Sequence, residues 1–120
     1  MRILLLTLVV LLSTSEAFAF TASWYSIKSL KKEGTYKYSK GVMANGKMFR
    51  DNALTCATRM YPLGSVLIVE NLRNSKSVRV LVTDRIGKRF SRARIDLSVL
   101  AFSKIADVNI GLITVSIRKD

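Results

Sequence analysis

Two aspartates, Asp84 and Asp96, are the residues of this chain best suited to acid–base chemistry. A partly buried carboxyl group can give a proton to a reacting oxygen, and its ionised form can accept hydrogen bonds from hydroxyl groups. The chain contains no His and a single Cys, Cys56, which excludes an imidazole base, a His metal site and a multi-cysteine zinc site. We therefore predict no metal site and no cofactor. Cys56 lies in an apolar stretch and is expected to be a buried, inert thiol.

The first aspartate ends a predicted strand. Val78, Val80 and Val82 recur at every second position, which is the period of a strand with one buried face. Asp84 follows in phase with these valines. A carboxylate there is either held by backbone N–H groups or partly desolvated in a cleft. A turn cap or an ion pair with Arg85 is the structural alternative to a role in a site.

The second aspartate precedes a predicted short helix. Leu97, Ala101 and Ile105 recur at helical spacing, and Ser98 is a suitable N-cap for this segment. Asp96 could satisfy N–H groups at the helix start, belong to a functional site, or do both.

The remaining elements are short strands joined by turns. Strands are expected over residues 21–27, 54–58, 65–70 and 112–117, and the strand at 65–70 is apolar enough to be buried on both faces. Residues 28–41 have no hydrophobic period and are expected to form a basic loop. Turns are predicted at Asn45-Gly46, at residues 62–64 and at residues 73–76. This pattern favours a β-rich barrel over a sandwich.

The chain begins with a predicted export signal. Residues 1–19 contain one Arg, an apolar run over 3–12 and the small-residue cleavage pattern Ala17-Phe18-Ala19. The apolar run is too short to span a membrane, and no Cys follows it for a lipid anchor. We expect a periplasmic or secreted protein of residues 20–120, folded as one domain without a membrane anchor.

The charge is strongly basic. Lys and Arg number 20 against 8 Asp and Glu, and the formal net charge is +12. A charge of this size favours an anionic polymer as partner, and outside the cytoplasm cell-wall polysaccharide is expected before nucleic acid. The alternative is that the cations only keep a small exported protein soluble.

Several motifs together resemble the rare lipoprotein A (RlpA) family. They are ASWY at 22–25, ANGK at 44–47, LTCAT at 54–58, YPLG at 61–64, VENL at 69–72, SVRVLVTDR at 77–85 and RIDLSVLAFSKIA at 94–106. The resemblance implies a six-stranded double-psi β-barrel with one or two short helices, related to the barrel of expansins. It also implies an exported protein that acts on peptidoglycan or another anionic wall polysaccharide, without nucleic acid, and we expect a monomer.

The resemblance also implies site residues. Family members use a Glu after the ANG motif, a His at the end of the following strand and the Asp of the DR corner. Here Lys47 stands in the place of the Glu, Thr58 in the place of the His, and Asp84 is kept. Expansin-like barrels use a second carboxylate, which matches Asp96. The aromatic segment nominates Tyr25 for the groove, and Arg85 is a further candidate for binding the glycan.

Three functions follow from these observations. The first is an endolytic lytic transglycosylase with Asp84 as acid and base. The second is a non-catalytic, expansin-like wall-binding or wall-loosening module, favoured by Lys47 and Thr58. The third is a basic exported protein that binds nucleic acid or an anionic membrane without recognising a glycan, and the export signal and the motifs count against it.

Overall fold

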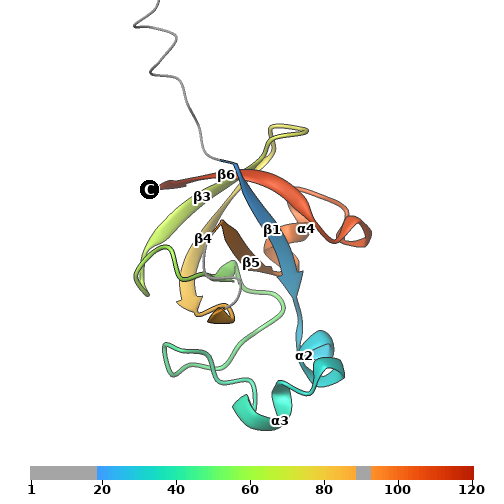
Figure 1. The fold of residues 1–120 in the computed structure, drawn as a ribbon, viewed down its shortest axis with the longest axis vertical. Helices are drawn as coiled ribbons and strands as arrows, with labels where there is room; N and C mark the ends of the chain where they lie inside the picture. The colour runs from blue at the N-terminus through green and yellow to red at the C-terminus, as the bar shows by residue number, and fades with distance from the viewer. Residues whose placement is uncertain (1–18, 89–92) are drawn as a thin grey trace, which may run out of the picture.

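The protein folds as a closed six-stranded β-barrel (Figure 1). The structure is a computed structural model that describes residues 19–88 and 93–120. The predicted export signal falls on residues 1–19, of which 1–18 lie outside the described residues. The strands are β1 (Phe20–Tyr25), β2 (Thr55–Ala57), β3 (Val66–Asn71), β4 (Ser77–Asp84), β5 (Arg94–Ser98) and β6 (Ile113–Lys119). Around the barrel they follow the order β1-β5-β2-β4-β3-β6, and β6 closes on β1.

Parallel and antiparallel pairs alternate where the site is formed. β1 pairs with β5, and β2 with β4, in parallel, whereas β2 and β5 are antiparallel. In this register Asp96 of β5 lies opposite Ser23 on one side and Ala57 on the other. Ala57 in turn lies opposite Asp84, after a register shift next to Cys56. The barrel therefore brings the two aspartates to either side of one β2 residue.

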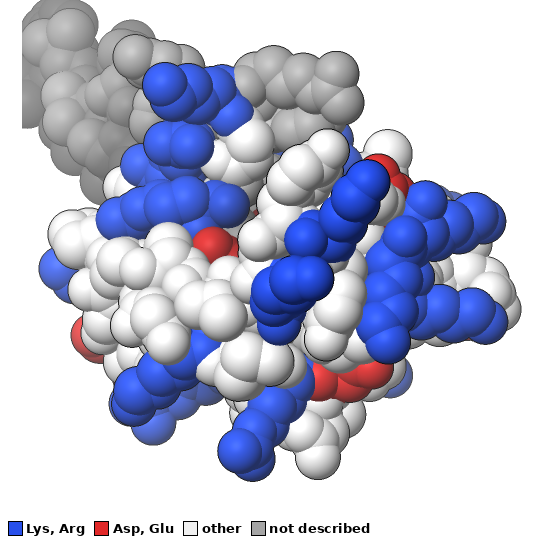
Figure 2. Space-filling model, turned by 90° about the horizontal axis from the view of Figure 1, so that it is seen from below, with Lys and Arg blue, Asp and Glu red and all other residues white. Residues whose placement is uncertain are grey.

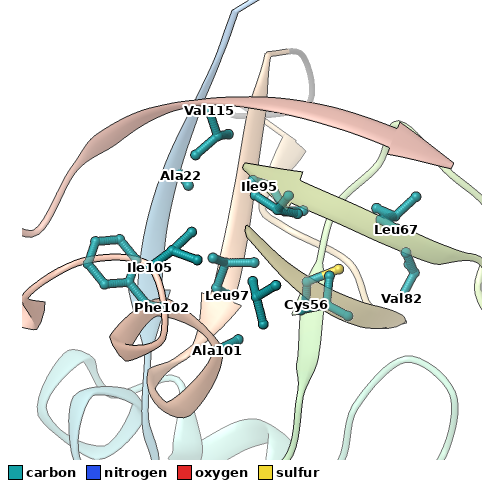
Figure 3. Close-up of a cluster of buried hydrophobic side chains, with 13 residues drawn as sticks. Ala22, Cys56, Leu67, Val82, Ile95, Leu97, Ala101, Phe102, Ile105 and Val115 are labelled. Carbon is teal, nitrogen blue, oxygen red and sulfur yellow. The ribbon is translucent and has the colours of Figure 1, made fainter. Parts of the chain in front are cut away.

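The barrel interior is a single apolar cluster (Figure 3). Every strand contributes to it, and the helix α4 (Val99–Ser103) adds Ala101 and Phe102, with Ile105 just beyond its end. Cys56 is fully buried in this cluster as a free thiol, as predicted. Its pKa is raised to about 12, first by burial and then by the charge of Asp96.

The strand predictions are confirmed with shifted ends. β4 has the predicted alternation, with Val78, Val80 and Val82 buried and Arg79 exposed. β1 ends earlier than expected because Ser26 caps the following helix. The prediction that residues 65–70 are buried on both faces is wrong. Alternate residues of β3 are buried and the others only partly covered, because a barrel strand turns just one face to the interior.

The predicted basic loop at 28–41 is also wrong, because two short helices form there. They are α2 (Ile27–Glu33) and α3 (Tyr36–Ser39). The side chains of Ser26 and Ser29 form a reciprocal capping box at the start of α2, and Gly34 ends the helix with a φ of 86°. Ile27 and Leu30 pack against a second cluster made of Tyr25, Met43, Phe49, Ala57 and Ile86.

The helix after Asp96 is confirmed but shorter than the predicted segment. Leu97, Ala101 and Ile105 are all buried, yet only Ala101 lies in α4, since Leu97 belongs to β5. Ser98 caps α4 by accepting the N–H of Ala101, as predicted. Within residues 19–88 and 93–120 the barrel thus carries three short α-helices rather than one or two, together with the 3-10 helix η2 (Val108–Ile110). No helix among the described residues combines the length and apolar character needed to cross a membrane.

Candidate functional site

A cleft of about 550 Å³ is lined by residues of α2 and of the ends of β1 and β4. It brings together four of the predicted site residues, Tyr25, Asp84, Arg85 and Asp96. The other residues that line it are Ser23, Trp24, Ser29, Leu30, Glu33, Thr35, Ala57, Ile86, Gly87 and Arg94. Figure 2 views the molecule from this end and shows Lys and Arg spread over the surface, with only small acidic areas between them.

Asp84, the last residue of β4, is held by backbone donors. Its Oδ1 accepts the N–H of Ala44 at 3.0 Å and the N–H of Arg85 at 2.8 Å. The bond to Ala44 ties the carboxylate to the turn around Asn45-Gly46, where Gly46 adopts the left-handed φ of 86° that this turn requires. Asp84 is therefore both a turn anchor and a carboxylate of the cleft.

Asp96 lies within β5 and not at the start of a helix. Its Oδ1 accepts the hydroxyl of Ser23 at 2.8 Å, and Ser98 caps α4 instead, so the helix-cap interpretation of Asp96 is wrong. Burial raises the pKa of Asp96 to about 6, against opposing contributions from the Ser23 hydrogen bond and from Arg94. Glu33 and Asp84 add smaller upward shifts to the pKa of Asp96 through like charge.

Tyr25 places a phenol beside the two carboxyl groups. The residue is only 6% exposed, and its ring stacks on Phe49 with centroids 4.4 Å apart. Its hydroxyl oxygen is buried and has no hydrogen-bond partner among the described residues. Burial, followed by the charges of Asp84 and Asp96, raises the pKa of Tyr25 above its ordinary value. The hydroxyl therefore stays protonated and can donate a hydrogen bond to a ligand.

Arg85 and Thr58 form part of the framework under the cleft. Nη1 of Arg85 donates to the carbonyl oxygens of Thr58 and Tyr61, each at 2.7 Å. The Thr58 side chain is fully buried, and its hydroxyl accepts the N–H of Met60 at 3.1 Å. Lys47 is exposed in the turn after Asn45. Neither Thr58 nor Lys47 lines the cleft.

Ser23 and Glu33 stand out among the cleft residues that the sequence analysis did not nominate. Ser23 is found only through the parallel register of β1 and β5, which joins residues 73 positions apart. Glu33 was hidden in the segment interpreted as a basic loop, although it is the one acidic residue among the lysines there.

Among the described residues, no three His, Cys, Asp or Glu side chains are grouped to hold a metal ion. The cleft therefore offers a carboxyl group of raised pKa, a second carboxylate and a hydrogen-bond donor for an oxygen-rich ligand.

The sequence profile of the lytic transglycolase family matches residues 17–117. The chain belongs to this family. The RlpA endolytic peptidoglycan transglycosylase of Pseudomonas aeruginosa is 38% identical over 98 residues, which are 82% of this chain and 26% of that protein. The chain spans about a quarter of the length of the first RlpA relatives it matches.

Solved structures support the same barrel for this lytic transglycolase family member. The Streptomyces papain inhibitor is similar with a TM-score of 0.61 and 23% identity, over 86% of this chain and 94% of that one. An expansin of Clavibacter michiganensis, in complex with cellohexaose, is similar with a TM-score of 0.58 and 22% identity, over 86% of this chain and 50% of the expansin chain. At these identities the likeness establishes the fold alone. The predicted RlpA-like double-psi β-barrel is confirmed.

Proposed function

We propose that this protein binds peptidoglycan glycan strands in the cleft and cleaves them endolytically as a lytic transglycosylase. The observation that carries the proposal is the pairing of two carboxyl groups in one open cleft, where the pKa of Asp96 is raised to about 6. The family match and the peptidoglycan transglycosylase relatives support the same substrate class.

In the proposed reaction Asp96 is the acid. A carboxyl group with a pKa near 6 is partly protonated near neutral pH and can donate to the glycosidic oxygen as its bond to the anomeric carbon breaks. The carboxylate of Asp84 stabilises the positive charge that develops on that carbon. The 6-hydroxyl of the same sugar then attacks the anomeric carbon, and its proton passes to Asp96. Asp96 regains its starting protonation state, and no water is consumed.

This assignment differs from the sequence-based hypothesis, which gave the acid role to Asp84. Oδ1 of Asp84 already accepts two backbone N–H groups, an arrangement that suits a fixed negative charge better than a proton donor. The environment of Asp96 instead favours the protonated form, since burial is the largest contribution to its raised pKa. Asp84 then contributes electrostatic stabilisation, and both aspartates remain in the proposed machinery.

The other predicted site residues have supporting roles in the proposal. Tyr25 donates its hydroxyl to the bound sugar, and Arg85 adds positive charge to the cleft while bracing the chain at Thr58. Lys47 extends from the exposed turn that Asp84 holds, where it can contact a long anionic glycan outside the cleft.

Digestion of peptidoglycan sacculi tests the proposal. Intact and amidase-denuded sacculi are incubated with the purified protein, Asp96→Asn, Asp84→Asn and the exposed control Asp107→Asn, and the soluble products are read by mass spectrometry. We expect anhydro-ended fragments from the wild type and the control, and at least a hundredfold less from either site variant. Fragments that persist undiminished in Asp96→Asn would refute its role as the acid.

A non-catalytic, expansin-like wall binder is the second candidate. It is favoured by Lys47 and Thr58, which stand where the family has its Glu and His. In this case the wild type releases no fragments but is retained on denuded glycan, and Asp84→Asn weakens that retention. The same incubation, followed by sedimentation of the sacculi, therefore separates the two functions.

We further propose that the protein works as a monomer in the periplasm or outside the cell. The predicted signal at residues 1–19 and the peptidoglycan-acting relatives support an extracytoplasmic location. Export would be tested by N-terminal sequencing of the protein from cell-envelope and culture fractions, with Phe20 expected first. An uncleaved chain confined to the cytoplasm would contradict it.

A further inference from the structure

Glu33 is placed at the cleft by the helix α2, which is anchored to the rest of the fold. Ser29, Leu30 and Glu33 of α2 all line the cleft. The helix is anchored at its start by the Ser26 capping box and by the N–H of Ile27, which donates to Oδ1 of Asp51 at 2.8 Å. Leu30 also packs against the second apolar cluster, so the face that carries Glu33 is held toward the cleft.

Nothing in the local structure favours a negative charge at this position. Glu33 is the last residue of α2, where the helix dipole disfavours an anion. Its carboxylate forms no ion pair with any of the described residues, although lysines surround it in the sequence. It also lies close enough to Asp96 to raise the pKa of that residue by like charge. Glu33 is exposed, and no ion pair among the described residues gives its carboxylate a stabilising role.

A second observation points to a ligand in the same cleft. Tyr25 is 6% exposed and lines the cleft, and its hydroxyl lacks a partner among the described residues. A buried donor without a partner costs free energy that a bound ligand would recover. The buried, unpaired donor of Tyr25 and the exposed carboxylate acceptor of Glu33 are complementary to the mixed hydroxyl and amide groups of a sugar.

The cleft also has opposite charges at different places along its wall. Glu33 belongs to α2, whereas Arg85 follows β4 and Arg94 begins β5, where the carboxyl groups of Asp84 and Asp96 also line the cleft. In Figure 1 the end of β4 and α2 lie on opposite sides of the barrel end. An anionic substituent would be repelled near Glu33, whereas on the other side Arg85 and Arg94 offset the charges of Asp84 and Asp96.

We propose that Glu33 is a further substrate-contacting residue that selects a neutral N-acetylated sugar for the α2 side of the cleft. The proposal rests on the glycan-binding function above. Glu33 accepts hydrogen bonds from hydroxyl or amide groups of the neutral sugar and rejects a sugar that carries a carboxylate. The neighbouring acidic sugar of the strand is then directed toward Arg85 and Arg94. Glu33 thereby sets the register in which an alternating glycan binds.

Binding selectivity tests this inference without requiring cleavage. Calorimetry at low salt gives the affinities for a neutral N-acetylglucosamine oligomer and for a denuded glycan fragment of equal length, which carries a carboxylate on every second sugar. We expect Glu33→Gln to lower the ratio of neutral to anionic affinity about tenfold, through a weaker acceptor and lost repulsion. Glu33→Asp keeps the charge and should keep most of the ratio.

The matched control is Glu70→Gln, which removes the same charge from β3, outside the cleft-lining residues. Its affinity ratio should equal that of the wild type. If the wild type binds glycan and Glu33→Gln keeps the wild-type ratio, the inference about Glu33 is overturned while the proposed function stands. If the wild type binds neither glycan, the proposed function itself fails.

Discussion

Replacing Asp96 by Asn should stabilise the protein at neutral pH and leave it almost unchanged in acid. The pKa of Asp96 is raised from 3.8 to about 6, chiefly by burial. Between these two values the folded protein keeps a proton that the unfolded chain has released. The contribution of Asp96 to the free energy of unfolding therefore falls as pH rises through this window, and it is constant below and above the window. Asn carries no charge and removes this dependence.

The magnitude follows from the size of the shift. A displacement from 3.8 to about 6 corresponds to about 3 kcal/mol between the ends of the window. The cleft is open, and water and Arg94 moderate the cost of the charge, so we expect about 1 to 2 kcal/mol. The free energy of unfolding of Asp96→Asn minus that of the wild type should thus rise by this amount between pH 4 and pH 6 and then level off.

Urea unfolding followed by Trp24 fluorescence, at pH values from 3.5 to 8, measures this difference. Taking the difference between variant and wild type cancels the contributions of the other titrating groups. Asp107→Asn is the control for the loss of one surface carboxylate, and it is suitable because Asn can keep the N-cap of η2. A difference that is flat with pH, or an Asp96→Asn variant that loses stability above pH 6, would show that burial does not dominate at this site. The acid role proposed for Asp96 would then lose its physical basis.

Two further predictions concern the buried groups beside Asp96. Tyr25→Phe removes a hydroxyl that has no hydrogen-bond partner among the described residues. The free energy of unfolding should therefore stay constant or rise by about 1 kcal/mol, while the affinity for glycan falls severalfold. A clear loss of stability in urea unfolding would reveal a hidden hydrogen bond. Cys56 is fully buried with a pKa raised to about 12, so a thiol reagent at pH 8 should label it only after denaturation. Mass spectrometry of the native protein measures this labelling, and rapid native modification would contradict the packing of the barrel core.

Part of the candidate site could be predicted because its signals are local. The alternation of valines predicted β4 and placed Asp84 at its end, and Ser98 was recognised as a cap from its position before an apolar segment. α2 was missed because only Ile27 and Leu30 of its residues are apolar, too few to give a period. Its stability comes from the capping box and from a cluster built by distant segments, which a local pattern does not contain.

Composition and short-range pattern by themselves predicted a basic, β-rich barrel without His, and they nominated two aspartates as the candidates for acid–base chemistry. Only the tertiary structure decided how those aspartates differ. Closure of the barrel sets Asp96 in a strand against Ser23 and partly buries it, whereas Asp84 is held by the backbone N–H groups of Ala44 and Arg85. It also carries Glu33 to the same cleft on a helix. Burial and like charge act through space, so the pKa of a carboxyl group is fixed by neighbours that the order of residues along the chain does not reveal.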